Sequence, residues 1–564
     1  MNVKHESRYA RGSQRFRLNL VTVLSLPLML LILTAQSALA QGSKMTQLEA
    51  PGNQANATHP IAVNASEAVV GYGTATSGAT VGFLYSGGKY TLINWKGSDN
   101  YTRALGINDS NEVVGDWLDS NGVTYHGFTY IKGAYQQYDV GGDVSTSIFG
   151  VNSAGDFAGA EGNEGTGVLE GFTYINKKLV EFYANGTDPT YAYAINSSNE
   201  VVGEYIDSSN IPHGYYRSSS GAITDIAYPG AVWTIAFGIN DAGEITGTYQ
   251  NTSGLTYGFT YVKGNYATTD FASTFGVSKN GAYTGYYWGI DGVQSGYVAS
   301  PQSFKLTTVK VPNDQQAFLY GVNKAGVFVG KYVDSSGTEH GMMISGGNVT
   351  NIDDSNGVST VCFAINSTNH IVGDYFDTSG NPHGFEYTAG KFTDIPGPST
   401  ALSSDASGIN DAGEISGDFF SSTDRTHHGF VLKGGKYKQL DPPGSTNTFG
   451  GGINAAGLVG LFWVDAKGYV QSSLYNGKKF TSINVPGIAQ TYAQAINTAG
   501  DIVFFVLDPY GVEHAALKEG NDYFIFDDPK GFNTGAAGIN DNNLIVGFYT
   551  PTGQSVPQPY KGTE

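Results

Sequence analysis

The sequence predicts an all-β fold made of tandem β-propellers. The favoured arrangement is two six-bladed rings of four-stranded blades, and the alternative is one large ring or an unequal split of the blades. Three observations predict this fold class. A motif recurs along the chain about every 44 residues, no window shows a sustained 3.6-residue apolar period, and 78 glycines with 13% aromatic residues suit short strands and tight turns.

The repeated motif is clearest at 408–419, which reads Gly-Ile-Asn-Asp-Ala-Gly-Glu-Ile-Ser-Gly-Asp-Phe. An asparagine after Ile or Val marks each copy, and successive copies lie 43 or 44 residues apart. Between Asn240 and Asn323 lie two periods, and Ser278 takes the marker position there, which brings the number of copies to twelve. Such a period is typical of propellers and solenoids, and the missing helical pattern excludes leucine-rich and helical solenoids. The marker asparagines are Asn64, Asn108, Asn152, Asn196, Asn240, Asn323, Asn366, Asn410, Asn454, Asn497 and Asn540.

Each period is predicted to form four short strands joined by turns. The first strand follows the marker turn, as at 112–117, where residues are β-branched and alternate in polarity. A loop such as 377–380 leads to a second strand at 383–387, which begins with His-Gly-Phe. A glycine turn at 434–436 leads to a third strand at 437–441, and a fourth strand runs into the next Gly-Ile-Asn. Four strands in about 40 to 45 residues match one propeller blade.

Twelve blades exceed the usual four to eight of one ring, so we place a boundary near residue 300. Residues 45–299 then form a first propeller from repeats one to six, and residues 303–564 form a second from repeats seven to twelve. Each half begins with a third and a fourth strand and ends with a first and a second. We therefore expect each ring to close by a blade that takes two strands from each end.

Residues 1–40 are predicted to be a bacterial signal peptide of the Sec type. Basic residues at Lys4, Arg8, Arg11, Arg15 and Arg17 precede an apolar run at 18–34, and Ala38-Leu39-Ala40 is a small-residue cleavage site. The alternative is a retained membrane anchor, which the short run and its interruption by Pro27 disfavour. We expect the mature protein to be secreted, extracellular or periplasmic, and to have no membrane contact after cleavage.

Charge and cysteine content exclude several function classes. The chain has a net charge of −19, and removing the leader, with its five basic residues and one acid, leaves −23. Three arginines remain, Arg103, Arg217 and Arg425, which argues against nucleic acid or an anionic membrane as partner. The single Cys362 allows no internal disulfide, and a small buried strand residue is the favoured interpretation over a reactive thiol.

The most suggestive candidate residues are pairs of an acid in the first strand and a histidine in the second. Because the two positions flank a hairpin loop, we expect them to face each other and to hold the strands in register. The functional alternative is a set of metal ligands or acid/base dyads. Repetition in both halves favours the structural role, since a catalytic site breaks repeat symmetry. The pairs are Asp116 with His126, Glu204 with His213, Asp374 with His383, and Asp418 with His428.

No cofactor is predicted, although the sequence leaves calcium open. The Asp-rich hairpin loops 119–122, 334–337 and 353–357 are explained by turn chemistry, because Asp, Ser, Asn and Gly favour tight turns. Calcium in these loops is the alternative, but the ligand spacing of an EF-type loop is absent. Aromatic residues are predicted mainly to pack blades together, with stacking on sugars as the alternative for Trp95, Trp117, Trp233, Trp288 and Trp463.

The His-Gly-Phe that follows an Ile-Asn-x-x-Gly-x-Val-x-Gly strand resembles the bacterial extracellular HAF-repeat family. The resemblance is carried by 126–128, 383–385 and 428–430, and by 238–243 upstream of a weaker copy at 257–259. It spans nearly the whole mature chain and implies a secreted repeat protein of unassigned function with no catalytic residue. The chain departs from the family in having Gly where the family name has Ala, and in copies without the histidine.

The sequence therefore predicts a non-enzymatic binding or interaction scaffold for an extracellular macromolecule, either a polysaccharide or a protein at the cell surface. We expect a monomer that does not bind nucleic acid. The alternative is a carbohydrate-active hydrolase or lyase with carboxylates in one propeller channel. No zinc-protease, serine-hydrolase, phosphate-binding or Cys-x-x-Cys motif occurs, and three scattered arginines disfavour a sialidase.

Overall fold

The computed structural model describes residues 43–563 apart from 99, 141–144, 164–167, 270–272, 289–293, 302–304, 312–315, 509–510 and 528–530. The predicted signal peptide lies outside the described residues. Every regular element in the described ranges is a β-strand, as predicted. Within these ranges no helix is long and apolar enough to cross a membrane.

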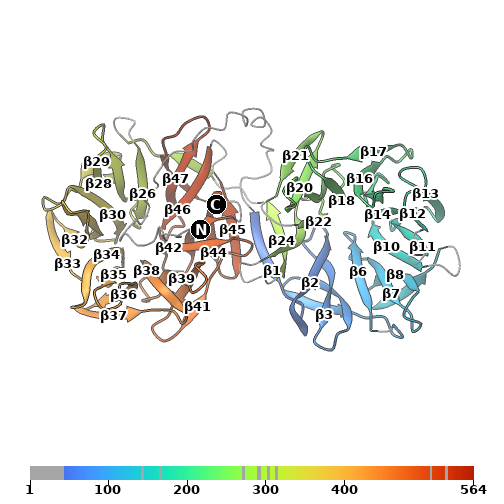
Figure 1. Ribbon diagram of the computed structural model, residues 1–564, viewed down its shortest axis with the longest axis horizontal. Coiled ribbons are helices and arrows are strands. Elements are labelled where there is room, and N and C mark those ends of the chain that lie inside the picture. The colour runs from blue at the N-terminus through green and yellow to red at the C-terminus, as the bar shows by residue number, and fades with distance from the viewer. Residues whose placement is uncertain are drawn as a thin grey trace, which may run out of the picture. The chain divides into compact units, whose positions relative to one another are not determined.

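The chain separates into two compact units, which we call the first unit, Lys44–Pro301, and the second unit, Gln302–Glu564. The repeat pattern predicts a boundary in the same region, between repeats six and seven. In Figure 1 the strands of each unit follow one another around a centre in chain order, from blue to green in the first unit and from yellow to red in the second.

The first unit contains six blades of four antiparallel strands. Blade 1 consists of β2 (Asn53–Val63), β3 (Val69–Ala75), β4 (Thr80–Ser86) and β5 (Lys89–Ile93). Blade 2 consists of β6 (Thr102–Ile107), β7 (Val113–Leu118), β8 (Tyr125–Ile131) and β9 (Ala134–Tyr138). Blade 3 consists of β10 (Ser145–Val151), β11 (Phe157–Asn163), β12 (Val168–Ile175) and β13 (Lys178–Phe182). Blade 4 consists of β14 (Thr190–Ile195), β15 (Val201–Ile206), β16 (Pro212–Arg217) and β17 (Ile223–Ile226). Blade 5 consists of β18 (Trp233–Ile239), β19 (Ile245–Gln250), β20 (Thr256–Val262) and β21 (Asn265–Thr268). Blade 6 consists of β22 (Ser273–Val277), β23 (Tyr283–Trp288), β24 (Gln294–Pro301) and β1 (Ser43–Leu48).

The second unit repeats this plan with six further blades. Blade 7 consists of β26 (Ala317–Val322), β27 (Phe328–Val333), β28 (Glu339–Ser345) and β29 (Asn348–Asn351). Blade 8 consists of β30 (Ser359–Ile365), β31 (Ile371–Phe376), β32 (Pro382–Thr388) and β33 (Lys391–Ile395). Blade 9 consists of β34 (Ala401–Ile409), β35 (Ile415–Ser421), β36 (His427–Lys433) and β37 (Lys436–Leu440). Blade 10 consists of β38 (Ser445–Ile453), β39 (Val459–Asp465), β40 (Val470–Tyr475) and β41 (Phe480–Ser482). Blade 11 consists of β42 (Gln490–Ile496), β43 (Ile502–Leu507), β44 (Glu513–Glu519) and β45 (Asp522–Phe526). Blade 12 consists of β46 (Gly531–Ile539), β47 (Ile545–Pro551), β48 (Gln558–Thr563) and β25 (Lys305–Thr308).

Each unit closes on itself, because its first inner strand contacts its last blade. β2 contacts β22, β23 and β24 in the first unit, and β26 contacts β46, β47 and β48 in the second. The last blade takes one strand from the start of its unit: β1 pairs with β24, and β25 pairs with β48. The predicted closure by two strands from each end is therefore wrong. The strand that precedes Gly-Ile-Asn pairs with the strand that follows it, as β6 does with β7, so it is the innermost strand of the next blade.

The core of each blade depends on a pairing of small and large residues across its two middle strands. In ten blades a glycine of the second strand lies directly opposite a large, fully buried residue of the third, as Gly417 lies opposite Phe430. In blade 10 the sizes are exchanged, with Leu461 opposite Ser473, and in blade 11 Phe504 lies opposite Ala516. One residue of each pair is small and the other is large, so the interior of each blade stays closely packed although the sequence varies. The other nine pairs are Gly71–Phe83, Gly115–Phe128, Gly159–Phe172, Gly203–Tyr215, Gly247–Phe259, Gly285–Tyr297, Gly330–Met342, Gly373–Phe385 and Gly547–Tyr560.

The marker asparagines tie neighbouring blades together. Each is buried at the end of an inner strand, and its Oδ1 accepts backbone N–H groups of the following turn, as Asn410 does from Ala412 and Glu414. In all of them but Asn497, Nδ2 donates to the backbone carbonyl of the next marker residue, as in Asn410 to Asn454 at 3.0 Å. The same interblade bond, at 2.9 to 3.2 Å, starts from Asn64, Asn108, Asn152, Asn196, Asn240, Asn323, Asn366, Asn454 and Asn540. Asn497 Nδ2 donates instead to the side chain of Asn543 at 3.0 Å.

Candidate functional site: the channel of the first unit

A channel with a cavity volume of about 270 Å³ lies at the centre of the first unit and is lined by all six inner strands. The residue three positions before each marker contributes to this lining, and in the first unit it is always a large apolar or aromatic residue. We call these residues the channel ring. They are Ile61, Leu105, Phe149, Tyr193, Phe237 and Phe275.

Four aromatic members of the channel ring contact one another in sequence. The ring centroids are 5.2 Å apart for Phe149 and Tyr193, 5.1 Å for Tyr193 and Phe237, and 4.9 Å for Phe237 and Phe275. These separations are those of favourable aromatic packing. All four side chains remain partly exposed, so the channel presents a curved aromatic wall.

Arg103 places a guanidinium in this lining. Its Nε and Nη2 donate to the two carboxylate oxygens of Asp116 at 2.9 and 2.5 Å, and Ser147 Oγ donates to Asp116 at 2.7 Å. Burial disfavours the charged guanidinium, but the carboxylate of Asp116 outweighs burial and raises the pKa of Arg103, so the guanidinium stays charged. Three half-buried tyrosine rings lie 5.5 to 5.9 Å from the guanidinium carbon: Tyr72, Tyr101 and Tyr125.

A second acid, Glu204, is hydrogen-bonded to Tyr193, which lines the cavity. The hydroxyl of Tyr193 donates to Glu204 Oε1 at 2.5 Å. Burial raises the pKa of Glu204, and the hydrogen bond from Tyr193 opposes that shift. Burial also raises the pKa of Tyr193, and the nearby Glu204 carboxylate adds to this effect, so the tyrosine stays protonated and donates.

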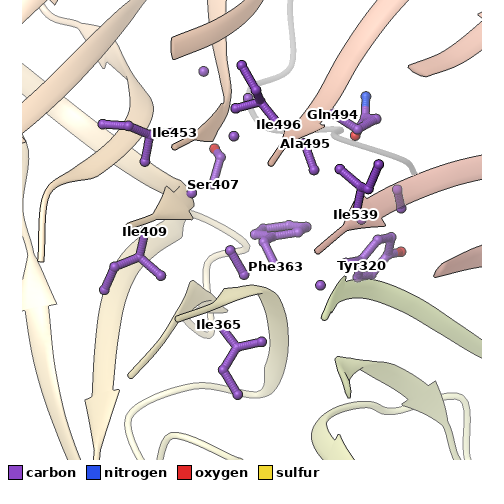
Figure 2. A pocket seen from close by; sticks show the side chains of 18 of the residues that line it. Tyr320, Phe363, Ile365, Ser407, Ile409, Ile453, Gln494, Ala495, Ile496 and Ile539 are labelled. Carbon is purple, nitrogen blue, oxygen red and sulfur yellow. The ribbon is translucent and has the colours of Figure 1, made fainter. Parts of the chain in front are cut away.

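The channel of the second unit is smaller and differently lined. Its cavity volume is about 120 Å³, less than half that of the first unit. Figure 2 shows the side chains that surround it, which include Phe363, Ser407 and Gln494. Two of its lining residues, Tyr320 and Ala537, belong to a buried apolar cluster with Phe318, Phe505 and Phe548. The first unit therefore offers the stronger candidate site.

The structure corrects the predicted acid–histidine pairs. The strand register places His126 opposite Trp117 and places Asp116 opposite Gly127, so the predicted partners lie on opposite faces of the sheet. The same one-residue offset separates Glu204 from His213, Asp374 from His383, and Asp418 from His428. The prediction is wrong because neighbouring residues in a strand point to opposite faces.

Three of the four predicted acids bond to the inner strand of the next blade. Asp116 accepts from Ser147 in β10, Asp374 Oδ1 accepts the backbone N–H of Ala406 in β34 at 3.1 Å, and Asp418 Oδ1 accepts that of Gly450 in β38 at 3.4 Å. Asp418 Oδ2 also lies 3.1 Å from Nδ1 of His427. These acids are buried and join adjacent blades, which is a structural role.

The four predicted histidines pair with aspartates of the hairpin loops and outer strands. His213 and His383 each contact the loop aspartate six residues earlier, Asp207 at 3.1 Å and Asp377 at 3.2 Å. The ring of His126 stacks on Trp117 with centroids 4.6 Å apart, and its Nδ1 lies 2.9 Å from Asp139. His428 contacts Asp424 at 3.0 Å and Asp441 at 2.9 Å. Each histidine therefore joins a loop or an outer strand to an aromatic ring of its blade.

The Asp-rich loops show the predicted turn chemistry. Asp119 Oδ1 accepts the backbone N–H of Asn121, Asp334 Oδ1 accepts those of Ser336 and Thr338, and Asp354 Oδ1 accepts that of Asn356. These oxygens serve the turns themselves.

The remaining sequence candidates lie mainly in packing positions. Cys362 is fully buried in β30, and burial raises the pKa of its thiol, which confirms the interpretation as a buried strand residue. Trp117 is 8% exposed and stacks on Trp95 with centroids 5.1 Å apart. Trp463 Nε1 donates to Ser473 at 3.0 Å, Trp233 is partly buried, and the side chain of Trp288 lies outside the described residues.

No family model matches this chain. A comparison with curated proteins also found no match. Among solved structures, the chain is similar to a mutant Aleuria aurantia lectin in complex with α-methyl-L-fucoside, at 15% identity and a TM-score of 0.32, covering 45% of this chain and 93% of the lectin. It is also similar to a gluconolactonase from Xanthomonas campestris, at 10% identity and a TM-score of 0.31, covering 46% and 89%. A third match is the β-propeller domain of the Trilobed protease from Pyrococcus furiosus, at 11% identity and a TM-score of 0.22, covering 64% and 89%.

Sequence reasoning missed the channel ring. The sequence singles out Arg103 only as one of three arginines and offers tryptophans as sugar-stacking residues, whereas Phe149, Tyr193, Phe237 and Phe275 line the cavity. The signal was nevertheless present in the repeat. Aligning the copies on their markers shows a large residue at the third preceding position in every copy of the first unit. In the second unit only Tyr320 and Phe363 are large there, and the other four copies have Ser407, Gly451, Gln494 and Ala537.

Proposed function

We propose that the protein is a non-enzymatic carbohydrate-binding scaffold that captures a polysaccharide through the channel of its first unit. The observation that carries this proposal is the channel ring, whose partly exposed aromatic members line one cavity together with Arg103. The channel of the second unit, with less than half the volume and a buried apolar cluster in its lining, serves as the internal comparison.

The composition of the channel suits a sugar. Ligand sites are mostly apolar and aromatic with a few polar groups that fix orientation, and their volumes start at roughly 300 Å³. The first channel, at about 270 Å³, is near that lower bound and has room for one sugar unit or chain end. The C–H faces of a pyranose pack on aromatic rings, and tyrosine hydroxyls and a guanidinium can hydrogen-bond its hydroxyl groups.

The acids beside the channel favour binding over catalysis. Asp116 already accepts two hydrogen bonds from Arg103 and one from Ser147, so its oxygens are occupied. Glu204 accepts from Tyr193. A glycoside hydrolase needs one carboxyl group free to protonate the leaving oxygen and another free to attack or to activate water. We therefore retain the hydrolase or lyase as the second candidate, not the first.

The proposed location is outside the cytoplasm, either extracellular or periplasmic. It rests on the basic and apolar leader at 1–40, which lies outside the described residues, and on the acidity of the remaining chain. The resemblance to the HAF-repeat family supports the same location. A polysaccharide or a surface protein is the class of partner that such a location offers.

A glycan-array screen of the full chain, with and without calcium, followed by calorimetric titration of the strongest oligosaccharide, tests the proposal. Phe237→Ala removes part of the aromatic wall, and the phenylalanine ring has no hydrogen-bonding group to lose. Phe363→Ala makes the matched change in the second unit. We expect Phe237→Ala to weaken binding at least tenfold and Phe363→Ala to leave it unchanged.

Three results would count against the proposal. If the protein binds no glycan on the array but captures a surface protein, the partner is a protein and not a carbohydrate. Equal loss of affinity in both variants would remove the site from the first channel. Release of reducing sugar from a bound glycan would establish the hydrolase.

A further inference from the structure

Blade 3 of the first unit departs from the pattern of its neighbours at one set of positions. In blades 2 and 4 the second strand places an aromatic residue opposite the histidine of the third strand, Trp117 opposite His126 and Tyr205 opposite His213. In blade 3 the register instead places Glu161 opposite Glu170. The aromatic–histidine pair has therefore been replaced by two carboxylates.

A third acid completes the group from the outer strand. Glu161 in β11, Glu170 in β12 and Glu181 in β13 each offer an oxygen within 4.8 Å of the others. Glu161 is 7% exposed, whereas Glu170 is partly exposed and Glu181 is exposed, so the group opens to solvent on its outer side. The hydroxyl of Tyr183 donates to Glu170 Oε1 at 2.6 Å and holds that carboxylate in place.

The buried end of this group has an unmet bonding requirement. Glu161 Oε2 is buried and has no hydrogen-bond partner. Oxygens of Glu170 and Glu181 lie within 4.8 Å of an oxygen of Glu161. A buried carboxylate normally has a charged partner or several donors. Here the charged groups that act on Glu161 are themselves acids, so a cation is the group that would satisfy all three.

We propose that Glu161, Glu170 and Glu181 form a site for a hard divalent cation of the calcium class on the flank of blade 3. Calcium binds six to eight oxygens at about 2.3 to 2.6 Å, so two oxygens on opposite sides of one ion lie up to roughly 5 Å apart. The three oxygens lie within 4.8 Å of one another, which is inside that limit. Three carboxylates fill part of the coordination sphere, and water enters from the open side at Glu181. The ion would clamp the outer strand β13 to the middle of the blade.

A comparable group in the second unit is a weaker candidate. Asp405, Asp418 and His427 also offer ligand atoms within 4.8 Å of one another. Its third member is an imidazole, which calcium does not favour, and His427 Nδ1 already contacts Asp418 at 3.1 Å. It serves as the internal competitor in the test.

The test uses the full chain after removal of metal with a chelator. Calcium is titrated by calorimetry at pH 7.5, and terbium is titrated as a luminescent calcium substitute excited through tyrosine, with Tyr183 bonded to one proposed ligand. Glu161→Gln removes the buried ligand charge. Glu181→Gln changes an exposed residue, so it tests the site even if the first variant does not fold. The matched control is Asp225→Asn, because Asp225 lies opposite Tyr215 as Glu181 lies opposite Phe172.

We expect one saturable calcium site in the wild type, a dissociation constant at least tenfold higher in Glu161→Gln and Glu181→Gln, and no change in Asp225→Asn. Calcium should also raise the thermal midpoint of the wild type and not that of Glu181→Gln. Absence of saturable binding would overturn the proposal and leave the carboxylates neutralised by protons. Binding that both glutamine variants retain, and that Asp418→Asn removes, would overturn it in favour of the group in the second unit.

Discussion

The side chain of Asn540 donates from Nδ2 to the backbone carbonyl of Asn323 at 2.9 Å, although the two residues are 217 positions apart. It joins the last blade of the second unit to the first by the same bond that links successive blades. In the first unit the corresponding last marker is Ser278, which has no amide to donate. Ser278 Oγ accepts the backbone N–H of Ala282, and the nearby Asn280 Nδ2 donates to Ala65 at 2.9 Å.

Replacing Ser278 by asparagine should stabilise the first unit. The new Oδ1 would accept from the turn as other markers do, and the new Nδ2 would reach the carbonyl of Asn64. One added buried hydrogen bond contributes about 1 kcal/mol to the free energy of unfolding. The measurement is the urea midpoint of the transition assigned to the first unit. Ser278→Ala, which loses the acceptor for Ala282, should lower that midpoint. An unchanged or lower midpoint for Ser278→Asn would contradict the role of the marker bonds.

Gly417→Ala should strongly destabilise the second unit. A Cβ at this position would lie 2.0 Å from the backbone carbonyl oxygen of Asp405 and 2.8 Å from the ring of Phe430. Neither can move without shifting strands, so we expect a loss of at least about 3 kcal/mol in the free energy of unfolding.

The matched control is Gly460→Ala in the next blade, where the nearest heavy atom would be 3.6 Å away. Denaturant unfolding followed by fluorescence compares the two variants. A similar stability for both would show that the small and large pairing across the middle strands does not limit the fold.

Arg103→Leu should destabilise the first unit more than loss of an exposed charge would. The change leaves the fully buried Asp116 with the hydroxyl of Ser147 but without its guanidinium. Removing one partner of a buried ion pair costs about 3 to 5 kcal/mol of the free energy of unfolding. The double variant Arg103→Leu with Asp116→Asn removes the stranded charge and should regain part of that loss. Equal stability of the single and double variants would show that the carboxylate is solvated despite its burial.

Between about pH 4 and pH 2, acid should remove the stability that the Asp334 carboxylate gives to the loop 334–337. Hydrogen bonds from Ser336 and Thr338, and then from His340, lower the pKa of Asp334 from 3.8 to about 2. Because the unfolded state binds a proton more readily, the stability that ionised Asp334 contributes is complete above about pH 4 and is lost as pH falls toward 2.

Asp334→Asn lacks this titration. The difference in urea midpoint between the wild type and Asp334→Asn should therefore shrink between pH 4 and pH 2. The control is Asp394→Asn on the outer strand of the next blade. A difference that stays constant with pH would rule out the carboxylate as the source.

Much of the fold could be predicted because the repeat is local. The spacing of the markers predicts the number of blades, and turn residues such as Asp334 and Gly434 predict where strands begin and end. The closure of each ring was not predictable in the same way. Whether the strand before Gly-Ile-Asn belongs to the preceding or the following blade depends on hydrogen bonds between strands. β2 pairs with β3 and β26 pairs with β27, so this strand belongs to the following blade.

The site was less predictable, because side-chain direction alternates along a strand. Pairing Asp116 with His126 required the register to within one residue, and the actual register turns the two side chains to opposite faces. The same alternation brings Glu161, Glu170 and Glu181 together, although they are distributed over 21 positions of the chain and form no motif.

The sequence by itself determined the all-β class, the twelve copies and the turns, since each depends on residues that are neighbours in the chain. The tertiary structure alone decided which side chains meet: the asparagine bonds between blades, the aromatic wall of the first channel and the three glutamates of blade 3. The physical reason is that a propeller brings each strand against partners that are about 44 residues away, and the exact register of those contacts is set by packing between blades and not by local preference.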